Sequence, residues 1–286
     1  MDKPANHPHR PLISVITCTK NSARYLPDCL ASLAKQTYAN IEHIIIDAAS
    51  TDGTLDIITR LAPRALIYQQ TGHGLYTALN EGLTRATGDV IGFLHSDDLL
   101  ADEHCLERVA AAFQKEQELS FFCSRMEVFD EITNENFAVL GAPPHAPAWR
   151  EWLYSSNYYA HPTYYCTGET IQRVGTYDES YRIAADVDWL IRLEKLKLPF
   201  YFDPTPLIRF RSTHGVSARH HILALREEWT IRKKNNQTGP VLALVYAWHF
   251  SRRAVRLLLE RIGFASIIPA ARKMISGIFS GITNLD

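Results

Sequence analysis

The sequence predicts an α/β fold built around a mostly parallel β-sheet. Short apolar runs rich in β-branched residues alternate with segments whose leucines recur at helical spacing, in the order β-α-β-α-β-α-β. One of these runs, residues 89–94, leads directly into Asp97 and Asp98. Because α/β proteins bind ligands at the carboxyl ends of their parallel strands, we expect helices on both faces of the sheet and a ligand site along that edge.

The first two predicted strands each end in a polar turn. Residues 12–18 are short and β-branched, and Leu26, Leu30 and Leu33 follow at helical spacing, with a proline early in the helix. A second apolar run, residues 41–46, stops abruptly at acidic and small residues. Both strands therefore lead into polar loops.

The later elements follow the same two patterns. In chain order they are a helix with Leu55, Ile58 and Leu61, a strand over residues 65–68, a helix with Leu75, Leu79 and Leu83, and the strand over residues 89–94. The regularity weakens beyond Phe113. There we expect a strand over residues 121–129 and a leucine-rich helix that starts near Asp186.

The composition is that of a globular protein. The chain has 286 residues, of which 46% are hydrophobic and 21% charged, enough for a substantial core. Residues 1–10 lack the apolar stretch of a signal peptide, so we expect a cytoplasmic protein. The five cysteines are scattered without a CxxC pair, which argues against a disulfide framework and a zinc site. We expect no nucleic-acid partner.

The net charge of −1 conceals an uneven distribution. From Arg219 to Asp286 there are eleven Lys and Arg against four Asp and Glu, so this tail carries +7 and the rest of the chain −8. Residues 241–250 are apolar but too short to span a bilayer, which takes about 20 residues. Residues 252–279 alternate basic and apolar positions. Such a tail can lie on anionic lipid at the inner face of the cytoplasmic membrane, or form a helical hairpin that packs on the core or on a second subunit of a homodimer.

Acidic residues at element ends have two interpretations each. Asp97 and Asp98 repel each other unless a cation lies between them and a ligand, and hard oxygen ligands favour Mg²⁺ or Mn²⁺ shared with a phosphate. The alternative is a simple cap on the helix expected from about residue 101. Asp186 is likewise either the N-cap of its helix or a carboxylate aimed into a cleft.

Five segments of the chain, in order, resemble the motifs of the inverting family 2 glycosyltransferases with the GT-A fold, whose sheet is Rossmann-like. They are residues 13–21, 46–54, 74–82, 88–98 and 183–190. The most similar branch is that of bacterial enzymes of colanic acid, O-antigen and exopolysaccharide synthesis. The resemblance covers roughly residues 11–215 of the chain.

The resemblance implies a role for individual side chains. The residues implied in donor binding are Thr17, Thr19 and Asn21 around the nucleotide, Asp47 on the base, Ser50 and Asp52 in the turn beneath it, and Asn80, Ser96 and Asp97. Asp97 matches the last acid of the family's DxD metal motif, with Asp98 as its neighbour, and Asp186 matches the catalytic base. His214 falls where a further metal or diphosphate contact is placed in related enzymes, although a surface-loop histidine is the simpler interpretation.

The implied reaction is a single displacement with inversion at the anomeric carbon. A UDP-sugar is the expected donor, and the acceptor is a hydroxyl of a saccharide or of a lipid-linked saccharide in cell-surface polysaccharide synthesis. Mg²⁺ or Mn²⁺ would neutralise the departing diphosphate, and Asp186 would take the proton of the acceptor hydroxyl. The resemblance divides the chain into a nucleotide-sugar half (1–113), an acceptor and catalytic-base half (114–218) and the basic tail (219–286).

Three positions depart from the family's pattern. His95 replaces the first acid of DxD, Ala48 a frequent second acid after Asp47, and Ala185 the glutamate before the catalytic aspartate. A catalytically degenerate protein that binds a sugar nucleotide or acts as a scaffold is therefore the alternative hypothesis. A dinucleotide-dependent oxidoreductase is disfavoured because residues 72–77 lack the third glycine, and a pyrophosphorylase because residues 17–20 contain no glycine.

Overall fold

The computed structural model describes residues 10–131, 133–141, 160–211 and 220–236, together with 239–240, 243–244, 246–248 and 250–251. Residues 1–237 form one compact unit and residues 238–286 a second. His214 and residues 252–286 of the predicted tail lie outside the described residues. No helix among the described residues is long and apolar enough to cross a membrane.

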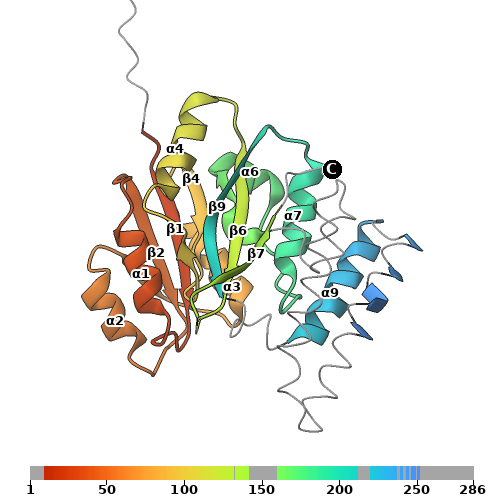
Figure 1. The fold of residues 1–286 in the computed structure, drawn as a ribbon, viewed down its shortest axis with the longest axis horizontal. Helices are drawn as coiled ribbons and strands as arrows, with labels where there is room; N and C mark the ends of the chain where they lie inside the picture. The colour runs from red at the N-terminus through yellow and green to blue at the C-terminus, as the bar shows by residue number, and fades with distance from the viewer. Residues whose placement is uncertain are drawn as a thin grey trace, which may run out of the picture. The chain divides into compact units, whose positions relative to one another are not determined.

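Four parallel strands form the first half of the sheet, as the sequence predicts (Figure 1). They are β1 (Ile13–Thr19), β2 (Ile41–Asp47), β3 (Leu66–Gln69) and β4 (Val90–Phe93), joined through α1 (Leu26–Ala34), α2 (Thr54–Leu61) and α3 (Leu75–Arg85). Their order in the sheet is β3-β2-β1-β4, and Thr19 of β1 is in register with Asp47 of β2. The loops that follow β1, β2 and β4 therefore meet at one edge.

The second half of the sheet mixes parallel and antiparallel pairs and continues the order as β4-β8-β6-β9-β5. Its elements are β5 (Leu99–Leu100), α4 (Cys105–Lys115), β6 (Phe121–Phe129), β7 (Asn136–Leu140), the 3₁₀ turn η1 (His161–Thr163), β8 (Tyr165–Thr167), α6 (Gly168–Val174), α7 (Ala185–Lys195), β9 (Phe200–Arg211) and α9 (His221–Lys234). The predicted strand over residues 121–129 and the predicted helix near Asp186 are confirmed.

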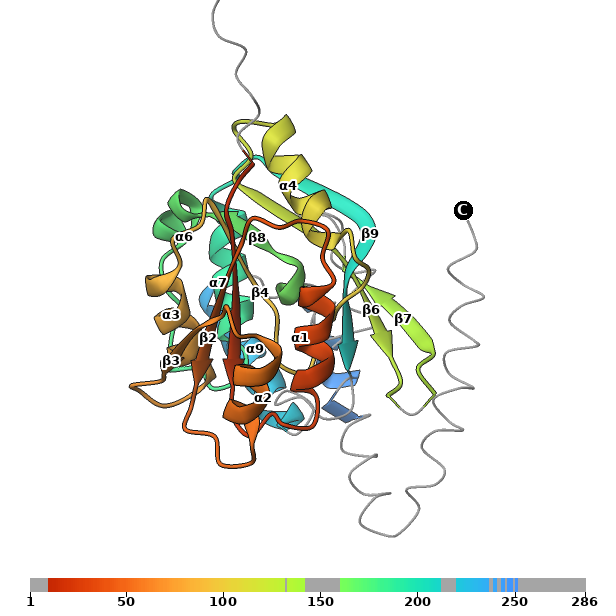
Figure 2. The same ribbon diagram turned by 90° about the vertical axis from the view of Figure 1, so that its left-hand side faces the viewer.

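Two apolar cores lie on opposite faces of the sheet because the buried strands alternate their side chains. In β2, Ile44 and Ile46 pack with α3, α6, α7 and α9, whereas Ile45 packs on the other face with α1, α2 and α4. Figure 2 shows α1 and α2 in front of the strands, with α3, α6 and α7 behind them. The fold is thus the α/β arrangement with helices on both faces that the sequence predicts.

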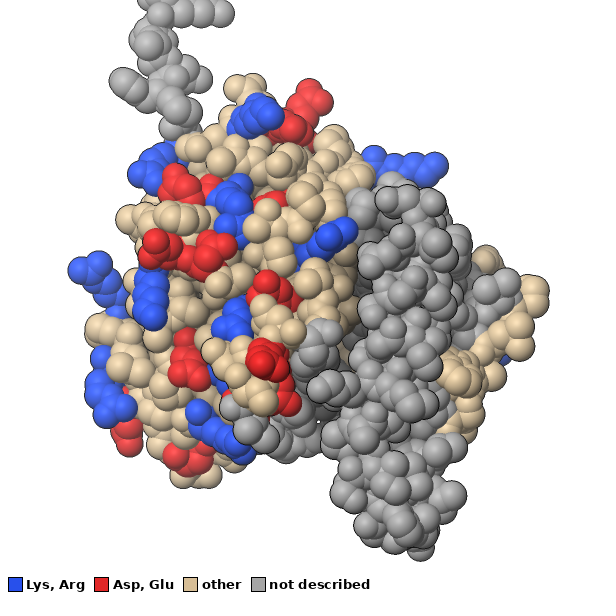
Figure 3. Space-filling view, in the orientation of Figure 1, with Lys and Arg blue, Asp and Glu red and all other residues tan. Residues whose placement is uncertain are grey.

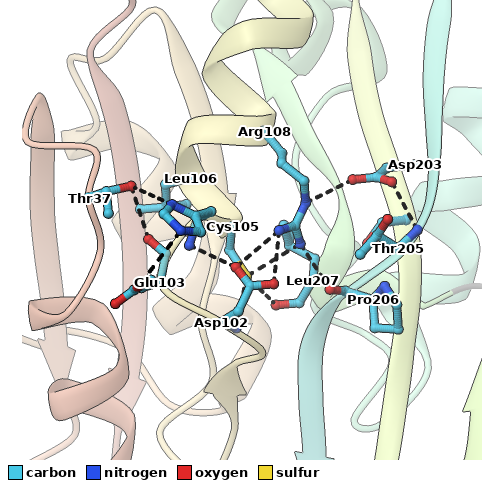
Figure 4. Close-up of polar contacts among 12 residues, drawn as sticks. Thr37, Asp102, Glu103, Cys105, Leu106, Arg108, Asp203, Thr205, Pro206 and Leu207 are labelled. Atoms are coloured by element: carbon cyan, nitrogen blue, oxygen red, sulfur yellow. Dashed lines mark hydrogen bonds and ion pairs between the residues drawn. The ribbon is translucent and has the colours of Figure 1, made fainter.

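The proposed helix cap by Asp97 and Asp98 is wrong. The short strand β5 follows these residues, and the helix α4 starts only at Cys105. The turn before the helix is instead held by Asp102, whose Oδ1 accepts the backbone N–H of His104 at 2.7 Å. Arg108 lies between Asp102 and Asp203, with Nη1–Oδ2 and Nε–Oδ2 distances of 2.9 and 3.0 Å, and so fastens α4 to β9 (Figure 4).

Candidate functional site

A hydrogen-bonded carboxylate lies where β1 and β2 end. Asp47 is 3% exposed, and its Oδ1 accepts the hydroxyls of Thr19 at 2.7 Å and Ser50 at 2.6 Å. Its Oδ2 accepts the backbone N–H of Ser50 at 2.8 Å. A carboxylate oxygen offers about two acceptor positions, so these bonds leave one on Oδ2 for a ligand donor.

Left-handed backbone occurs in both neighbouring loops. Asn21 after β1 has φ of 50° and Ala49 after β2 has φ of 54°, a conformation that costs a non-glycine residue energy. The Oδ1 atom of Asn21 accepts the N–H of Thr51 at 2.9 Å, and the N–H of Asn21 donates to Ser50 Oγ at 2.8 Å. The two loops therefore hold each other in place, and Asn21, Ser50 and Asp47 lie in one network.

The other predicted donor-binding residues near these loops have structural partners. Asp52 accepts the N–H of Ala23 at 3.0 Å and the hydroxyl of Thr54 at 2.6 Å, which shapes the turn before α2. Ser22 Oγ lies 3.0 Å from Ser96 Oγ and so joins the β1 loop to the β4 loop. Thr17 is buried, and its Oγ1 lies 3.1 Å from the Nε2 of His43 on β2.

Asn80 bonds to the protein interior. Its amide nitrogen donates to the carbonyl of Tyr177 at 3.1 Å and to Glu179 Oε1 at 2.8 Å, and its Oδ1 accepts the Tyr177 N–H at 2.9 Å. Asn80 thus ties α3 to the loop that leads towards α7.

The two neighbouring acids after β4 have different environments. Asp97 is half-buried, whereas Asp98 is fully buried and its Oδ1 accepts the N–H of Arg211 at 3.3 Å. Burial, followed by the charge of Asp97, raises the pKa of Asp98 well above its usual value. The Arg211 guanidinium donates to the Asp97 carbonyl at 3.0 Å and to Asp28 Oδ2 at 2.6 Å, so the end of β9 clamps this loop.

This edge offers few protein ligands for a metal ion. Among the described residues no group of three His, Cys, Asp or Glu is placed to hold an ion. Asp97 offers one half-buried carboxylate, and Mg²⁺ is commonly held by one or two carboxylates together with substrate phosphates and water.

Asp186 is held at the start of α7, but it is not the N-cap. The N-cap position is Ala184, and the Oδ1 of Asp186 accepts the Val187 N–H at 3.0 Å. The Tyr76 hydroxyl is shared between the Ile183 carbonyl at 2.6 Å and the Oδ1 of Asp186 at 3.0 Å. Burial raises the pKa of Asp186 to about 6, with a smaller contribution from the charge of Glu227, while the two hydrogen bonds act in the opposite direction. A carboxyl group with this pKa can accept a proton near neutral pH.

A row of aromatic rings connects Asp186 to the β4 loop. Tyr76, which bonds Asp186, lies 5.6 Å from the ring of Tyr177, and Tyr177 lies 5.6 Å from His161. His161 in turn stacks at 5.9 Å on His95, two residues before Asp97. The rings of Tyr177 and His161 are also joined by a 2.7 Å contact between the hydroxyl and Nε2. Packed rings therefore link the turn of the candidate base to the loop of the candidate metal ligand.

Sequence reasoning gave no role to Tyr76, His161, Tyr177 or Arg211. Tyr76 lies inside one of the family-like segments, 74–82. The sequence therefore pointed to this segment, but it did not predict the contact between Tyr76 and Asp186. His161 lies in an aromatic-rich segment, 158–163, that stands out in the sequence without indicating a role, and Tyr177 and Arg211 come from segments whose local pattern carries no sign of the site.

Residues 14–167 match the family model described as glycosyl transferase family 2. The chain is 36% identical over 188 residues to a PGL/p-HBAD biosynthesis glycosyltransferase of Mycobacterium bovis, covering 64% of this chain and 69% of the relative. It is 31% identical over 215 residues to the O-antigen biosynthesis protein RfbC of Myxococcus xanthus, covering 73% of this chain and 16% of RfbC.

Two solved structures share the fold. Residues 1–349 of S. aureus TarS, in complex with UDP-GlcNAc, give a TM-score of 0.62 at 20% identity over 77% of this chain and 64% of the TarS chain. The mannosyltransferase PcManGT from Pyrobaculum calidifontis, in complex with GDP-Man and Mn²⁺, gives 0.61 at 19% identity, covering 96% of this chain and 81% of PcManGT. This chain thus spans less than two thirds of that TarS chain. Both likenesses support the GT-A fold.

Proposed function

The chain belongs to glycosyltransferase family 2, and we propose that it moves a sugar from a nucleotide diphosphate donor to a hydroxyl of a saccharide or lipid-linked saccharide. Relatives named for PGL/p-HBAD and O-antigen biosynthesis support a role in polysaccharide or glycolipid synthesis. The neighbours in complex with UDP-GlcNAc and GDP-Man support a sugar-nucleotide donor, and a UDP-sugar is our proposal.

The environment of Asp186 carries the proposal. A sugar hydroxyl is too weak an acid to ionise at pH 7, so its attack needs a base that takes the proton as the bond forms. Asp186 supplies a half-buried carboxylate with a pKa of about 6, oriented by the hydroxyl of Tyr76. Attack from the face opposite the leaving diphosphate is a single displacement, which inverts the anomeric carbon.

The donor is proposed to bind along the ends of β1, β2 and β4. Asp47 keeps an acceptor position for the nucleobase, and the loops of Asn21 and Ser50 are fixed before the ligand arrives. Asp97 is the proposed protein ligand of Mg²⁺ or Mn²⁺, which when bound would neutralise charge on the diphosphate. The burial of Asp98 makes it the weaker candidate for a second ligand, and that role stays a prediction.

A nucleotide panel tests the donor site. We expect UDP with Mn²⁺ to raise the melting temperature of the full chain, with GDP, dTDP, CDP and an EDTA series as comparisons. A ligand at 100 times its Kd adds about 2.7 kcal/mol of stability, which is readily measured. No shift with any nucleotide would contradict the proposed donor site.

Substitutions at two neighbouring positions test whether Asp97 or Asp98 binds the metal ion. Asp97→Asn should abolish the Mn²⁺-dependent part of the shift because it removes the half-buried carboxylate. Asp98→Asn is the matched control, since its carboxyl group is buried and accepts the Arg211 N–H. If Asp98→Asn also abolishes the Mn²⁺ effect, Asp98 is a ligand as the sequence predicts.

A further inference from the structure

The helix that carries Asp186 lacks a side-chain cap from its N-cap residue. Its N-cap is Ala184, which has no side chain able to bond the free N–H groups of the first turn. Residues 182–184 also present three consecutive backbone N–H groups, of which those of Ile183 and Ala184 are partly buried. Unpaired donors of this kind destabilise a folded chain, so a partner is required.

The partner is a carboxylate from a distant helix. Glu227 on α9 accepts the N–H of Arg182 on Oε1 at 2.9 Å. Its Oε2 accepts the N–H of Ile183 at 2.9 Å and that of Ala184 at 3.1 Å. One half-buried glutamate therefore binds every N–H of a three-residue segment, and it does so from within the predicted basic tail.

We propose that Glu227 is a positioning residue for Asp186, because it holds the turn from which that carboxylate enters α7. The inference rests on the proposed role of Asp186 as the base. Residue 184 directly precedes α7, so three charge-assisted hydrogen bonds fix the turn from which Asp186 meets the Tyr76 hydroxyl.

The charges around Asp186 make the effect measurable. Tyr76 on α3 donates to its carboxylate, and Tyr177 belongs to the loop before α7. Asp188 on α7 accepts from Arg192 at 2.8 Å, so its charge is already paired. Glu227 on α9 is the negative charge that opposes ionisation of Asp186. Removing it should make Asp186 a weaker base.

The test is an NMR titration of the full chain labelled with ¹³C-aspartate, with the Asp186 signal assigned by its loss in Asp186→Asn. In Glu227→Gln we expect the pKa of Asp186 to fall, because a negative charge that opposes its ionisation is removed. The amides of residues 182–184 should also exchange with solvent faster, because glutamine has one acceptor oxygen and no charge, so that at least one of the three hydrogen bonds is lost and the others are weakened. If either readout keeps its wild-type value in Glu227→Gln, the proposal is overturned.

Two further variants separate positioning from general loosening of α9. Ile231→Val trims a fully buried side chain of α9 without changing charge, so it should leave the pKa of Asp186 unchanged. Glu227→Asp keeps the negative charge but has a shorter side chain. It should speed exchange of the 182–184 amides and shift the pKa of Asp186 less than Glu227→Gln does. Unchanged amide exchange in Glu227→Asp would overturn the proposal even if Glu227→Gln fails to fold. Neither readout needs a substrate, so retained transfer activity in Asp186→Asn would overturn the proposed base separately.

Discussion

Asp186 is balanced between groups that raise its pKa and groups that lower it. Burial and the charge of Glu227 favour the protonated acid, and the bonds from Tyr76 and Val187 favour the carboxylate. The resulting pKa of about 6 leaves the group ionised at pH 7 but still basic enough to take a proton in the transition state.

Asp186→Asn should lower turnover about 10²–10⁴-fold, the usual contribution of a well-placed base. Donor affinity, measured by the thermal shift with UDP, should not change. Asp178→Asn is a suitable control, because this nearby acid pairs with Lys234 at 3.8 Å. A catalytically degenerate scaffold does not depend on Asp186 as a base. Equal transfer rates in Asp186→Asn and Asp178→Asn would therefore favour the alternative hypothesis.

The same substitution should change stability in a pH-dependent way. The pKa of Asp186 is raised in the folded state from 3.8 to about 6, so its ionisation costs stability above pH 6. Asp186→Asn should therefore unfold at a higher temperature than wild type at pH 8, and the difference should shrink as the pH falls towards 4. A difference that grows towards low pH would contradict the raised pKa.

Tyr76→Phe should move the acid limb of the kcat/KM profile to higher pH. The Tyr76 hydroxyl donates to Asp186 and lowers its pKa, so its loss lets burial raise that pKa further above 6. Tyr177→Phe is the matched control, because that hydroxyl contacts His161 instead. A limb that stays in place in Tyr76→Phe would show that the hydrogen bond does not tune the base.

At the scale of elements, β4 and β8 are packed without spare room. Gly92 of β4 is paired with Tyr165 of β8, and a Cβ atom at position 92 would lie 2.3 Å from Cε1 of that ring. Tyr165 is fully buried, so the ring has little space to retreat. The β4 loop that carries Asp97 depends on this close approach.

Gly92→Ala should accordingly destabilise the protein by about 1–3 kcal/mol, the usual cost of overpacking a core. Gly168→Ala provides the comparison, because a Cβ there meets no atom within 4 Å. Chemical denaturation of the two variants measures the difference. Equal midpoints would mean that β8 shifts to accept the methyl group.

The elements that sequence patterns predicted are those with a local signal. The first four strands and the helix α7 each carry a run or repeat that needs no partner to be recognised. The strand β9 lacks such a pattern because Pro204 and Pro206 interrupt it. Its pairing with β6 tolerates the prolines through a register shift between Ser124 and Met126, which only the neighbouring strand reveals.

At the scale of the whole molecule, charge is unevenly divided along the chain. The face of the molecule in Figure 3 shows acidic and basic side chains interspersed over its described residues. The sequence from Arg219 carries a surplus of +7, and most of its basic residues lie outside the described part. Membrane contact and dimerisation through this tail stay predictions.

Vesicle co-sedimentation of the full chain tests the membrane hypothesis. Binding to vesicles with anionic lipid should exceed binding to neutral vesicles and fall with salt. Replacing Arg252, Arg253 and Arg256 with Gln should weaken it by roughly 100-fold, at about 1 kcal/mol for each basic residue near the surface. Equal binding by the triple variant, or a dimer without lipid affinity, would support the hairpin interpretation.

The sequence by itself determined the α/β class, the loops at the ends of β1, β2 and β4, and the placement of Asp186 at a helix start. These features depend on periodicity and on motifs that lie within a few residues of one another. Tertiary structure alone decided which of the two neighbouring acids, Asp97 or Asp98, is buried. It also brought Tyr76 to Asp186 across 110 residues of sequence, and Glu227 to residues 182–184 across 43 to 45 residues. The basicity of Asp186 depends on burial and on charges brought together by folding, and no local pattern in the chain encodes their distance.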